Sequence, residues 1–200
     1  MPSESDDEPD RNDLEYIKRV LRLPALNHTF ASFKKVSGSE LSLSAFWAMA
    51  EGDNKKPLLF CYGGYGNGKT HLVEAVVIRL YERGLLCPYY NFEDVTQRIK
   101  KGMRPESIYS ADDIVQSFCT RKMLLIDDYG LGTDTKWATG RLETIIDYRY
   151  RYRLWTILTT NKDLTELEEL SGRILSRFYD PDVSLMVINE ATDYRRRRNL

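Results

Sequence analysis

The chain has 200 residues, of which 42% are hydrophobic and 30% are charged, and these values fit one globular domain with a full-sized core. No stretch approaches the roughly 18 consecutive apolar residues that span a bilayer, and the acidic N-terminus lacks the apolar segment of a signal peptide, so we expect a cytoplasmic protein. The three cysteines have no CxxC spacing, which argues against a cysteine metal site and favours buried thiols: Cys61, Cys87 and Cys119.

The net charge of −1 hides an uneven distribution of charge along the chain. Residues 1–15 hold seven acids and one base, a net −6, which leaves +5 for the rest. The acidic segment is expected to be a solvated tail. A mildly basic remainder permits nucleic-acid binding but is equally compatible with an ordinary solvated surface.

Apolar periodicity predicts a helix at the start of the chain and then strands that alternate with helices. Such alternation implies an α/β fold with a parallel sheet covered on both faces, and we expect five strands. The expected strands are 58–62, 88–92, 123–126, 155–159 and 183–188. The expected helices are 13–21, 39–51, 71–83, 93–102, 111–119, 136–150 and 164–178.

A glycine-rich run follows the first strand and opens a helix. Gly63, Gly68, Lys69 and Thr70 satisfy the pattern GxxxxGK[ST] of a phosphate-binding loop (P-loop). Glycines let backbone N–H groups point at phosphate oxygens, lysine adds a positive charge, and the threonine hydroxyl is a ligand for Mg²⁺. The expected nucleotide-binding residues are Gly63, Gly64, Tyr65, Gly66, Asn67, Gly68, Lys69, Thr70 and His71.

Two carboxylates, Asp127 and Asp128, directly follow the apolar strand 123–126. In a P-loop enzyme this is the expected Walker B element, with Asp127 holding Mg²⁺ and Asp128 polarising the attacking water. Asp127 to Gly130 also satisfies DxxG, which is typical of GTPases. The guanine-reading pattern NKxD is not met, however, because Asp163 stands one place too early, and we therefore expect ATP.

Asn161 follows the strand 155–159, and carboxyl ends of parallel strands converge on a bound nucleotide. We expect Asn161 to contact the catalytic water or the γ-phosphate. Arg173 and Arg177 lie four residues apart on one helix face, where one of them could reach the nucleotide of a neighbouring subunit. A surface salt-bridge face is the alternative. The alternating run 148–153 is a further candidate for DNA contact, but strict alternation spreads its residues around a helix axis, and we therefore expect subunit packing.

Taken together, these motifs resemble the AAA+ ATPases of the DnaC/DnaI helicase-loader and IstB transposition-helper family. The resemblance covers about residues 28–195, and it implies a three-layer P-loop fold without a separate lid domain. It divides the chain into a tail with a short helix at 1–28, as a partner-binding element, and a core at 29–200. The motifs are GxxGNGKTHL at 63–72, LLIDDYG at 124–130, TTN at 159–161, RILSRF at 173–178 and DYR at 193–195.

The resemblance also implies roles for individual residues. Lys69 and Asp128 match catalytic residues of the two Walker motifs, Asn161 matches sensor 1, and Arg177 matches the arginine finger. Arg173 is the helical companion of Arg177. Arg195, in the DYR motif, is implied to sense the nucleotide.

DNA contact is a further implication of the resemblance. The expected carrier is the segment between the second and third strands, which combines cations with one aromatic ring and so suits single-stranded DNA. An ordinary solvated helix is the alternative. The residues concerned are Arg98, Lys100, Lys101, Arg104 and Tyr109.

The function that we expect is an ATP- and Mg²⁺-dependent loader of a replicative helicase, of the short phage type. It would bind single-stranded DNA, oligomerise into a ring or helix, and hydrolyse ATP between subunits in a bacterial or phage-infected cell. One alternative is an IstB-like helper of a transposase. Another is a nucleotide-gated DNA-binding adaptor with little turnover, because Asp128 is shorter than the glutamate that many AAA+ enzymes have at this position.

Overall fold

The computed structural model describes residues 14–130 and 135–194. Helices and strands alternate along them, in agreement with the apolar pattern. The four strands are β1 (Leu58–Tyr62), β2 (Met123–Ile126), β3 (Trp155–Thr159) and β4 (Ser184–Ile188). The helices are α1 (Leu14–Leu21), α2 (Glu40–Glu51), α3 (Lys69–Glu82), α4 (Phe92–Lys101), α5 (Ala111–Thr120), α6 (Thr135–Arg151) and α7 (Leu164–Phe178).

The sheet is parallel and has the strand order β2-β3-β1-β4. It has four strands, so the expectation of five is wrong. The segment 88–92 makes a single parallel bridge, from Asn91 to Asp127, beside the edge strand β2. The physical reason is local: the Asn91 side chain accepts a hydrogen bond from the Asp94 backbone N–H at 2.7 Å and caps α4, so the chain becomes helical at Phe92.

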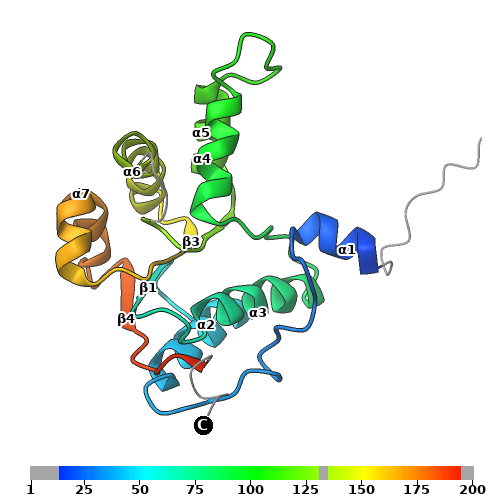
Figure 1. Cartoon of the computed structure of the whole chain (residues 1–200), viewed down its shortest axis with the longest axis vertical. Helices are drawn as coiled ribbons and strands as arrows, with labels where there is room; N and C mark the ends of the chain where they lie inside the picture. The colour runs from blue at the N-terminus through cyan, green and yellow to red at the C-terminus, as the bar shows by residue number, and fades with distance from the viewer. Residues whose placement is uncertain (1–13, 131–134, 195–200) are drawn as a thin grey trace, which may run out of the picture.

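Each face of the sheet is covered by helices, which makes three layers (Figure 1). Along β1, Leu58 and Phe60 pack into a core with residues of α4, α5, α6 and α7. The alternate residues Leu59 and Cys61 pack into a second core with α2 and α3. A parallel strand that is buried on both faces reads as a continuous apolar run, which is why β1 was recognisable in the sequence.

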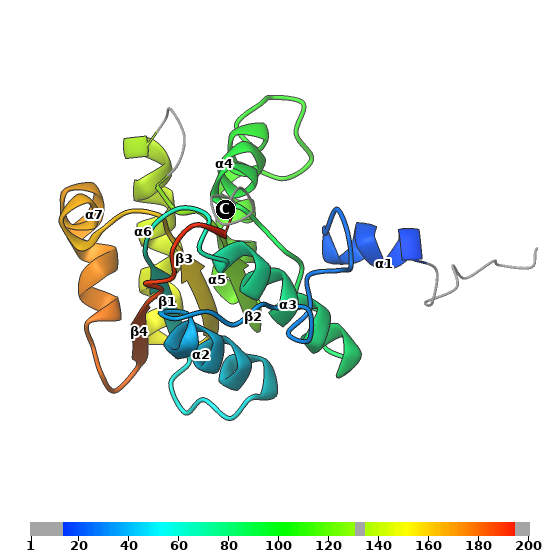
Figure 2. The ribbon, with the colours of Figure 1, turned by 60° about the horizontal axis from the view of Figure 1, so that its bottom comes forward.

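Helix α1 lies at the side of the molecule, away from the helices that cover the sheet (Figure 2). It is nevertheless anchored, because Leu21 and Leu23 are buried in the core that contains α2 and α3. The backbone N–H of Tyr89 donates to the Leu21 carbonyl at 2.8 Å, and this bond fixes the end of α1 beside the segment before α4.

Within the run 148–153, Arg149 is fully buried and contacts its own chain, so our expectation of subunit packing is wrong for this residue. Its guanidinium donates to the Phe118, Cys119 and Arg121 carbonyls at the end of α5, at 2.9, 3.1 and 2.8 Å. It also donates to Thr156 Oγ1 and to the Trp155 carbonyl. One side chain thus satisfies the free carbonyls at a helix end and joins α5 and α6 to β3.

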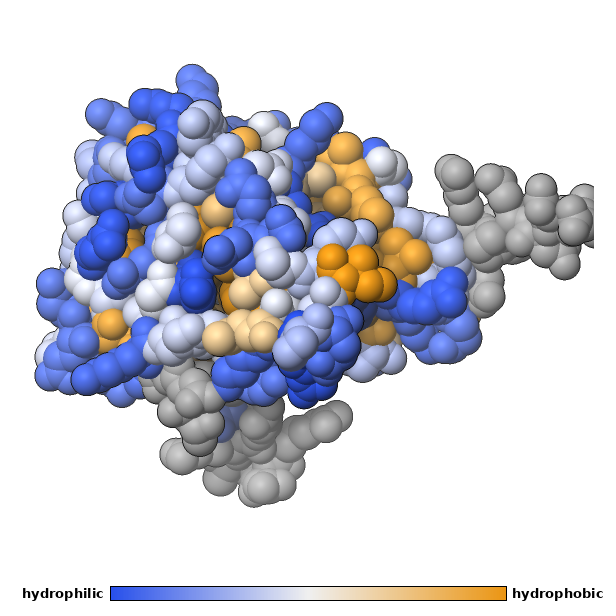
Figure 3. Space-filling view, turned by 90° about the horizontal axis from the view of Figure 1, so that it is seen from above, coloured by the Kyte–Doolittle hydropathy of each residue, from blue (hydrophilic) through white to orange (hydrophobic). Residues whose placement is uncertain are grey.

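All three cysteines are free and buried, as expected. Within the described residues, no helix is both long and apolar enough to cross a membrane. Seen from above, the surface is mostly hydrophilic, with apolar side chains in several separate groups (Figure 3).

Candidate nucleotide site

The P-loop connects the carboxyl end of β1 to the first turn of α3, as the motif requires. Gly63, Gly66 and Gly68 have φ angles of 135°, 67° and 95°, in the region that side chains rarely adopt. A Cβ atom at Gly63 would stand 2.3 Å from the Asn189 carbonyl oxygen. The glycines are therefore demanded by backbone conformation and by close packing. A glycine-rich loop of this kind can direct its backbone N–H groups at phosphate oxygens.

Lys69 is 3% exposed and is held by the loop that it serves. Its ammonium group donates to the Gly63 and Gly64 carbonyls, both at 2.7 Å, and to Asn67 Oδ1 at 3.0 Å. Burial lowers the pKa of Lys69, while the nearby negative charges of Asp127 and Asp128 act in the opposite direction. When a nucleotide binds, the Lys69 ammonium group can replace its hydrogen bonds to loop carbonyls by stronger contacts with charged phosphate oxygens.

The segment after β4 forms hydrogen bonds with the P-loop. Asn67 Nδ2 donates to the Asn189 carbonyl at 2.8 Å, and Asn189 Nδ2 donates back to the Asn67 carbonyl at 3.2 Å. Further along, the Tyr194 backbone N–H donates to the Gly66 carbonyl at 2.9 Å. The conformation of the loop thus depends on residues more than 120 positions away in the sequence.

Asp127 is fully buried at the end of β2. Its two carboxylate oxygens accept hydrogen bonds from Thr159 Oγ1, on the neighbouring strand β3, and from the Tyr89 hydroxyl at 3.1 Å. Within the described residues, Asp127 takes part in no salt bridge with a basic side chain. A buried carboxylate that accepts from two hydroxyl groups and forms no salt bridge can take a bound cation as a further partner.

These groups fit the Mg²⁺ ion that the motif implies. The hydroxyl of Thr70 and the carboxylate of Asp127 are hard oxygen ligands, and a carboxylate has lone pairs to spare after two hydrogen bonds. Protein sites for Mg²⁺ next to phosphates commonly supply only one or two ligands, and phosphate and water supply the rest. Among the described residues, no three or more His, Cys, Asp or Glu side chains are grouped so as to hold a metal ion by themselves.

Asp128 and Asn161 meet at the carboxyl ends of β2 and β3. Asn161 Nδ2 donates to Asp128 Oδ1 at 2.6 Å. Asp128 has a φ angle of 58°, which is rare for a residue with a side chain and is maintained here by its surroundings. Burial raises the pKa of Asp128, and so does the neighbouring Asp127, while the Asn161 hydrogen bond lowers it. Strained backbone and an oriented carboxylate together are features of functional sites.

His71 is turned toward the segment that precedes α2. Its Nε2 lies 2.9 Å from the Thr29 carbonyl oxygen, and its ring is stacked on His28 at a centroid distance of 4.6 Å. Burial lowers the pKa of His71, which favours the neutral ring. The residue therefore anchors residues 28–33 beside the first turn of α3. Its direct contact with a nucleotide stays a prediction.

The two arginines of α7 are engaged within their own chain. Arg177 donates to Asp147 Oδ1 of α6 through Nε at 3.0 Å and Nη2 at 2.8 Å, and its guanidinium lies over the Tyr150 ring. Arg173 lies 3.6 Å from Glu143 and is mostly exposed. Arg195 lies outside the described residues. A role for any of them at a neighbouring subunit's nucleotide stays a prediction.

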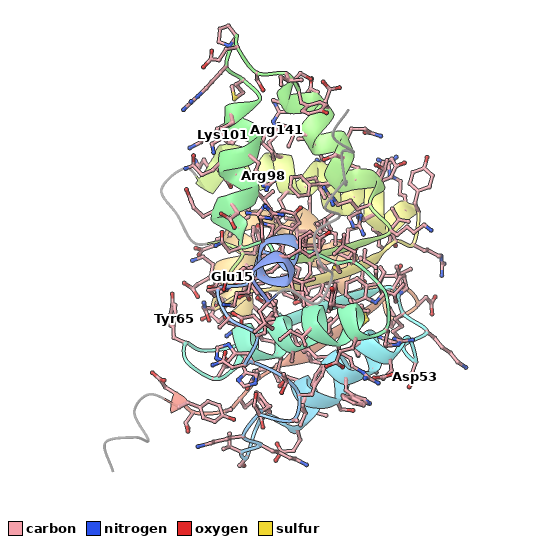
Figure 4. All side chains as sticks on the ribbon, turned by 90° about the vertical axis from the view of Figure 1, so that its right-hand side faces the viewer. Glu15, Asp53, Tyr65, Arg98, Lys101 and Arg141 are labelled. Carbon is pink, nitrogen blue, oxygen red and sulfur yellow. The ribbon has the colours of Figure 1, made fainter. Side chains whose placement is uncertain are left out.

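The expected DNA-binding residues lie on α4 and on the loop that follows it. Arg98 and Lys101 are exposed on α4 (Figure 4), as are Arg104 and Tyr109 on the loop. Lys100 is half-buried, with its ammonium 5.9 Å from the centre of the Trp137 ring. These five residues belong to α4 and the loop after it, and none of them is part of the P-loop.

The sequence did not reveal several residues that shape the site. Thr159 was identified only as part of a polar strand end, although its position on β3 beside Asp127 follows once β2 and β3 are known to be neighbours. No sequence signal distinguished Tyr89 or Asn189, because their partners lie far away along the chain.

The parallel sheet lies between two layers of helices, with a P-loop after β1, paired aspartates after β2 and an asparagine after β3. This arrangement defines a P-loop NTPase fold. The family described as Bacterial DnaA ATPase domain matches residues 25–183. The chain belongs to that family.

Among curated proteins, the chain is 27% identical over 157 residues to the chromosomal replication initiator protein DnaA of Flavobacterium psychrophilum. The match covers 76% of this chain and 32% of that protein, so the chain spans about a third of the length of the relative. Among solved structures, replication initiator DnaA bound to AMPPCP and single-stranded DNA has a TM-score of 0.69 at 23% identity, over 82% of this chain and 50% of that one. The DnaC helicase loader has a TM-score of 0.67 at 22% identity, over 82% and 97%.

Proposed function

We propose that this protein is a DnaC-like ATPase that loads a replicative helicase onto single-stranded DNA and hydrolyses ATP between its subunits. The observation that carries the proposal is the 2.6 Å hydrogen bond between Asn161 and Asp128, beside the P-loop and the buried Asp127. This bond orients the Asp128 carboxylate close to a phosphate-binding loop and to a candidate Mg²⁺ ligand. Nucleotide hydrolysis requires these three parts together.

In the proposed mechanism, each residue of the nucleotide site has a separate role. Backbone N–H groups of residues 63–69 bind the phosphates, and Lys69 leaves the loop carbonyls to contact them. Thr70 and Asp127 would hold Mg²⁺, which neutralises phosphate charge when bound. Asp128, kept in place by Asn161, accepts a hydrogen bond from the attacking water and aligns it with the terminal phosphate.

The fold is equally similar to the DnaC helicase loader, with a TM-score of 0.67, and to replication initiator DnaA, with a TM-score of 0.69. We propose the loader, of the phage type, because the motifs at 63–72, 124–130, 159–161 and 173–178 resemble those of the DnaC/DnaI group. The segment 1–28 is our candidate for contact with the helicase. An IstB-like transposition helper would have the same nucleotide site.

Phosphate release with and without single-stranded oligonucleotide tests hydrolysis. We expect turnover in the parent protein and a loss of about 100-fold or more in Asp128→Asn, with nucleotide binding retained, because only the water-orienting charge is removed. Asp53→Asn, in an exposed loop, is the matched control. A parent protein that binds nucleotide without releasing phosphate in either condition would instead be a nucleotide-gated adaptor.

Mixing variants tests whether hydrolysis takes place between subunits. Lys69→Ala removes the phosphate contact and keeps Arg177, whereas Arg177→Ala does the reverse. Each variant alone should be inactive, and a mixture should regain activity, because an intact P-loop can then face an intact arginine. Full activity of Arg177→Ala alone would remove the arginine from the mechanism.

A further inference from the structure

Three arginines from separate elements surround the ring of Tyr90. The guanidinium carbon of Arg22 lies 4.6 Å from the ring centroid, that of Arg98 lies at 5.4 Å, and that of Arg121 lies at 5.7 Å. Arg22 follows α1, Arg98 belongs to α4 and Arg121 follows α5. We call this group the Tyr90 arginine cluster. It lies beside the edge strand β2 and uses none of the residues of the nucleotide site.

Two nitrogen atoms of the cluster are buried without a hydrogen-bond partner. Among the described residues, Arg22 Nη1 and Arg121 Nε are two of only four side-chain atoms in that condition. A buried N–H group without an acceptor costs about 1–3 kcal/mol, and more when it is charged. Their presence as a pair in one cluster therefore points to an acceptor that the described residues do not supply.

The backbone conformation of Arg22 also indicates a ligand-binding position. Arg22 has a φ angle of 62°, which is uncommon for a residue with a side chain. The hydrogen bond from Tyr89 to the Leu21 carbonyl holds the chain at this point, and the turn brings the Arg22 guanidinium over Tyr90. Strain of this kind persists where the surroundings maintain it, and it is typical of ligand-binding positions.

The described residues supply little negative charge to the cluster. Among them, the only carboxylate in a salt bridge with these arginines is Asp94, which accepts from Arg22 Nη2 at 3.2 Å. Arg22 and Arg121 are half-buried, and the attraction of the Tyr90 ring, about 0.5–1 kcal/mol for each cation, does not offset the repulsion between like charges there. An oxyanion would satisfy both the charge and the two unpaired nitrogens.

We propose that the Tyr90 arginine cluster binds a phosphodiester group of single-stranded nucleic acid. A nucleic acid is favoured over free phosphate because the cluster continues along α4, where Arg98 and Lys101 are exposed on the same helix (Figure 4). Exposed cations on a helix, together with an exposed ring on the loop that follows it, here Tyr109, suit a strand whose backbone and bases both need contacts. The inference rests on the DNA binding in the proposed function and assigns it an anchoring point.

The test compares the parent protein with the double variant Arg22→Gln/Arg121→Gln in binding to a fluorescent oligo-dT, over a series of salt concentrations with ADP present. We expect affinity to fall about 10-fold at low salt. The slope of log affinity against log salt should be shallower by about 0.7, the value for one lost phosphate contact on a single strand. Lys55→Gln, an exposed cation on another surface, should leave both quantities unchanged.

A second experiment distinguishes failure of the anion site from failure of the proposed DNA-binding function. With the P-loop saturated by ADP, inorganic phosphate should raise the melting temperature of the parent but not of the double variant. If the parent binds no oligonucleotide and this difference remains, the anion site stands and the DNA-binding function fails. Equal oligonucleotide affinity and slope in parent and double variant, with unaltered ADP binding, would overturn the proposal.

Discussion

Asp147 of α6 accepts hydrogen bonds from two arginines, and one of them joins α6 to α7. One of its oxygens accepts from Arg177 of α7, and the other accepts from Arg151 of α6 at 2.6 Å. The Arg177 hydrogen bonds hold the pKa of Asp147 below its ordinary value. The same contact fixes the side chain that we propose to act on a neighbouring subunit. Asp147 thus stabilises the packing of α6 against α7 and also orients the Arg177 side chain.

Replacing Asp147 by Asn should lower the free energy of unfolding by about 0.5–1 kcal/mol at pH 7, since the pair is partly screened by solvent. The folded pKa lies below the unfolded one, so the stabilisation is complete above the unfolded value of about 4 and disappears as the pH falls through the folded value. Thermal melts of the parent and Asp147→Asn between pH 3 and pH 7 measure this. A difference that persists unchanged at pH 3 would show that charge is not its origin.

At the scale of elements, the packing of α5, α6 and β3 depends on the buried Arg149. The carbonyls at the end of α5 have no partner within the helix, and this guanidinium supplies one. Burial lowers the pKa of Arg149 to about 10, so it remains charged at neutral pH. A cation held by carbonyl groups thus takes a structural role at the centre of the helical layer.

Arg149→Leu should destabilise the protein by about 3 kcal/mol or more, because several buried carbonyls lose their donor at once. For a chain of this size that loss lowers the melting temperature by about 6–12 °C. Arg141→Leu, on the same helix, breaks a surface ion pair with Asp112 and a contact with the Trp137 ring, and it should cost less than about 1 kcal/mol. Chemical denaturation gives both values, and equal losses would contradict the role given to Arg149.

At the scale of the whole molecule, the segment that follows the last strand packs against the P-loop that follows the first strand. Asn67 in the loop and Asn189 after β4 exchange two hydrogen bonds, and the edge strand β4 pairs with β1 along its length. The nucleotide site is therefore complete only when the last strand has been added to the sheet.

Asn189→Ala should weaken ADP binding about 10-fold, as expected for the loss of about 1.4 kcal/mol of support for the loop. Glu190→Ala, an exposed neighbour, should bind as the parent does. Titration with a fluorescent ADP analogue measures both. Parent-like affinity in Asn189→Ala would mean that the loop keeps its conformation without this contact.

The sequence by itself determined the P-loop, the paired aspartates, Asn161 and nearly all helix and strand positions. These features depend on residues close together in the chain, where glycine torsions, apolar periodicity and strand ends act locally. It failed at 88–92, where the capping side chain of Asn91 ended the strand early.

Only the tertiary structure decided the strand order β2-β3-β1-β4, the hydroxyl partners of Asp127, the burial of Arg149 and the gathering of three arginines around Tyr90. Each depends on contacts between residues far apart in the sequence. Such contacts are set by how layers pack and which side-chain rotamers fit, and no local pattern records them.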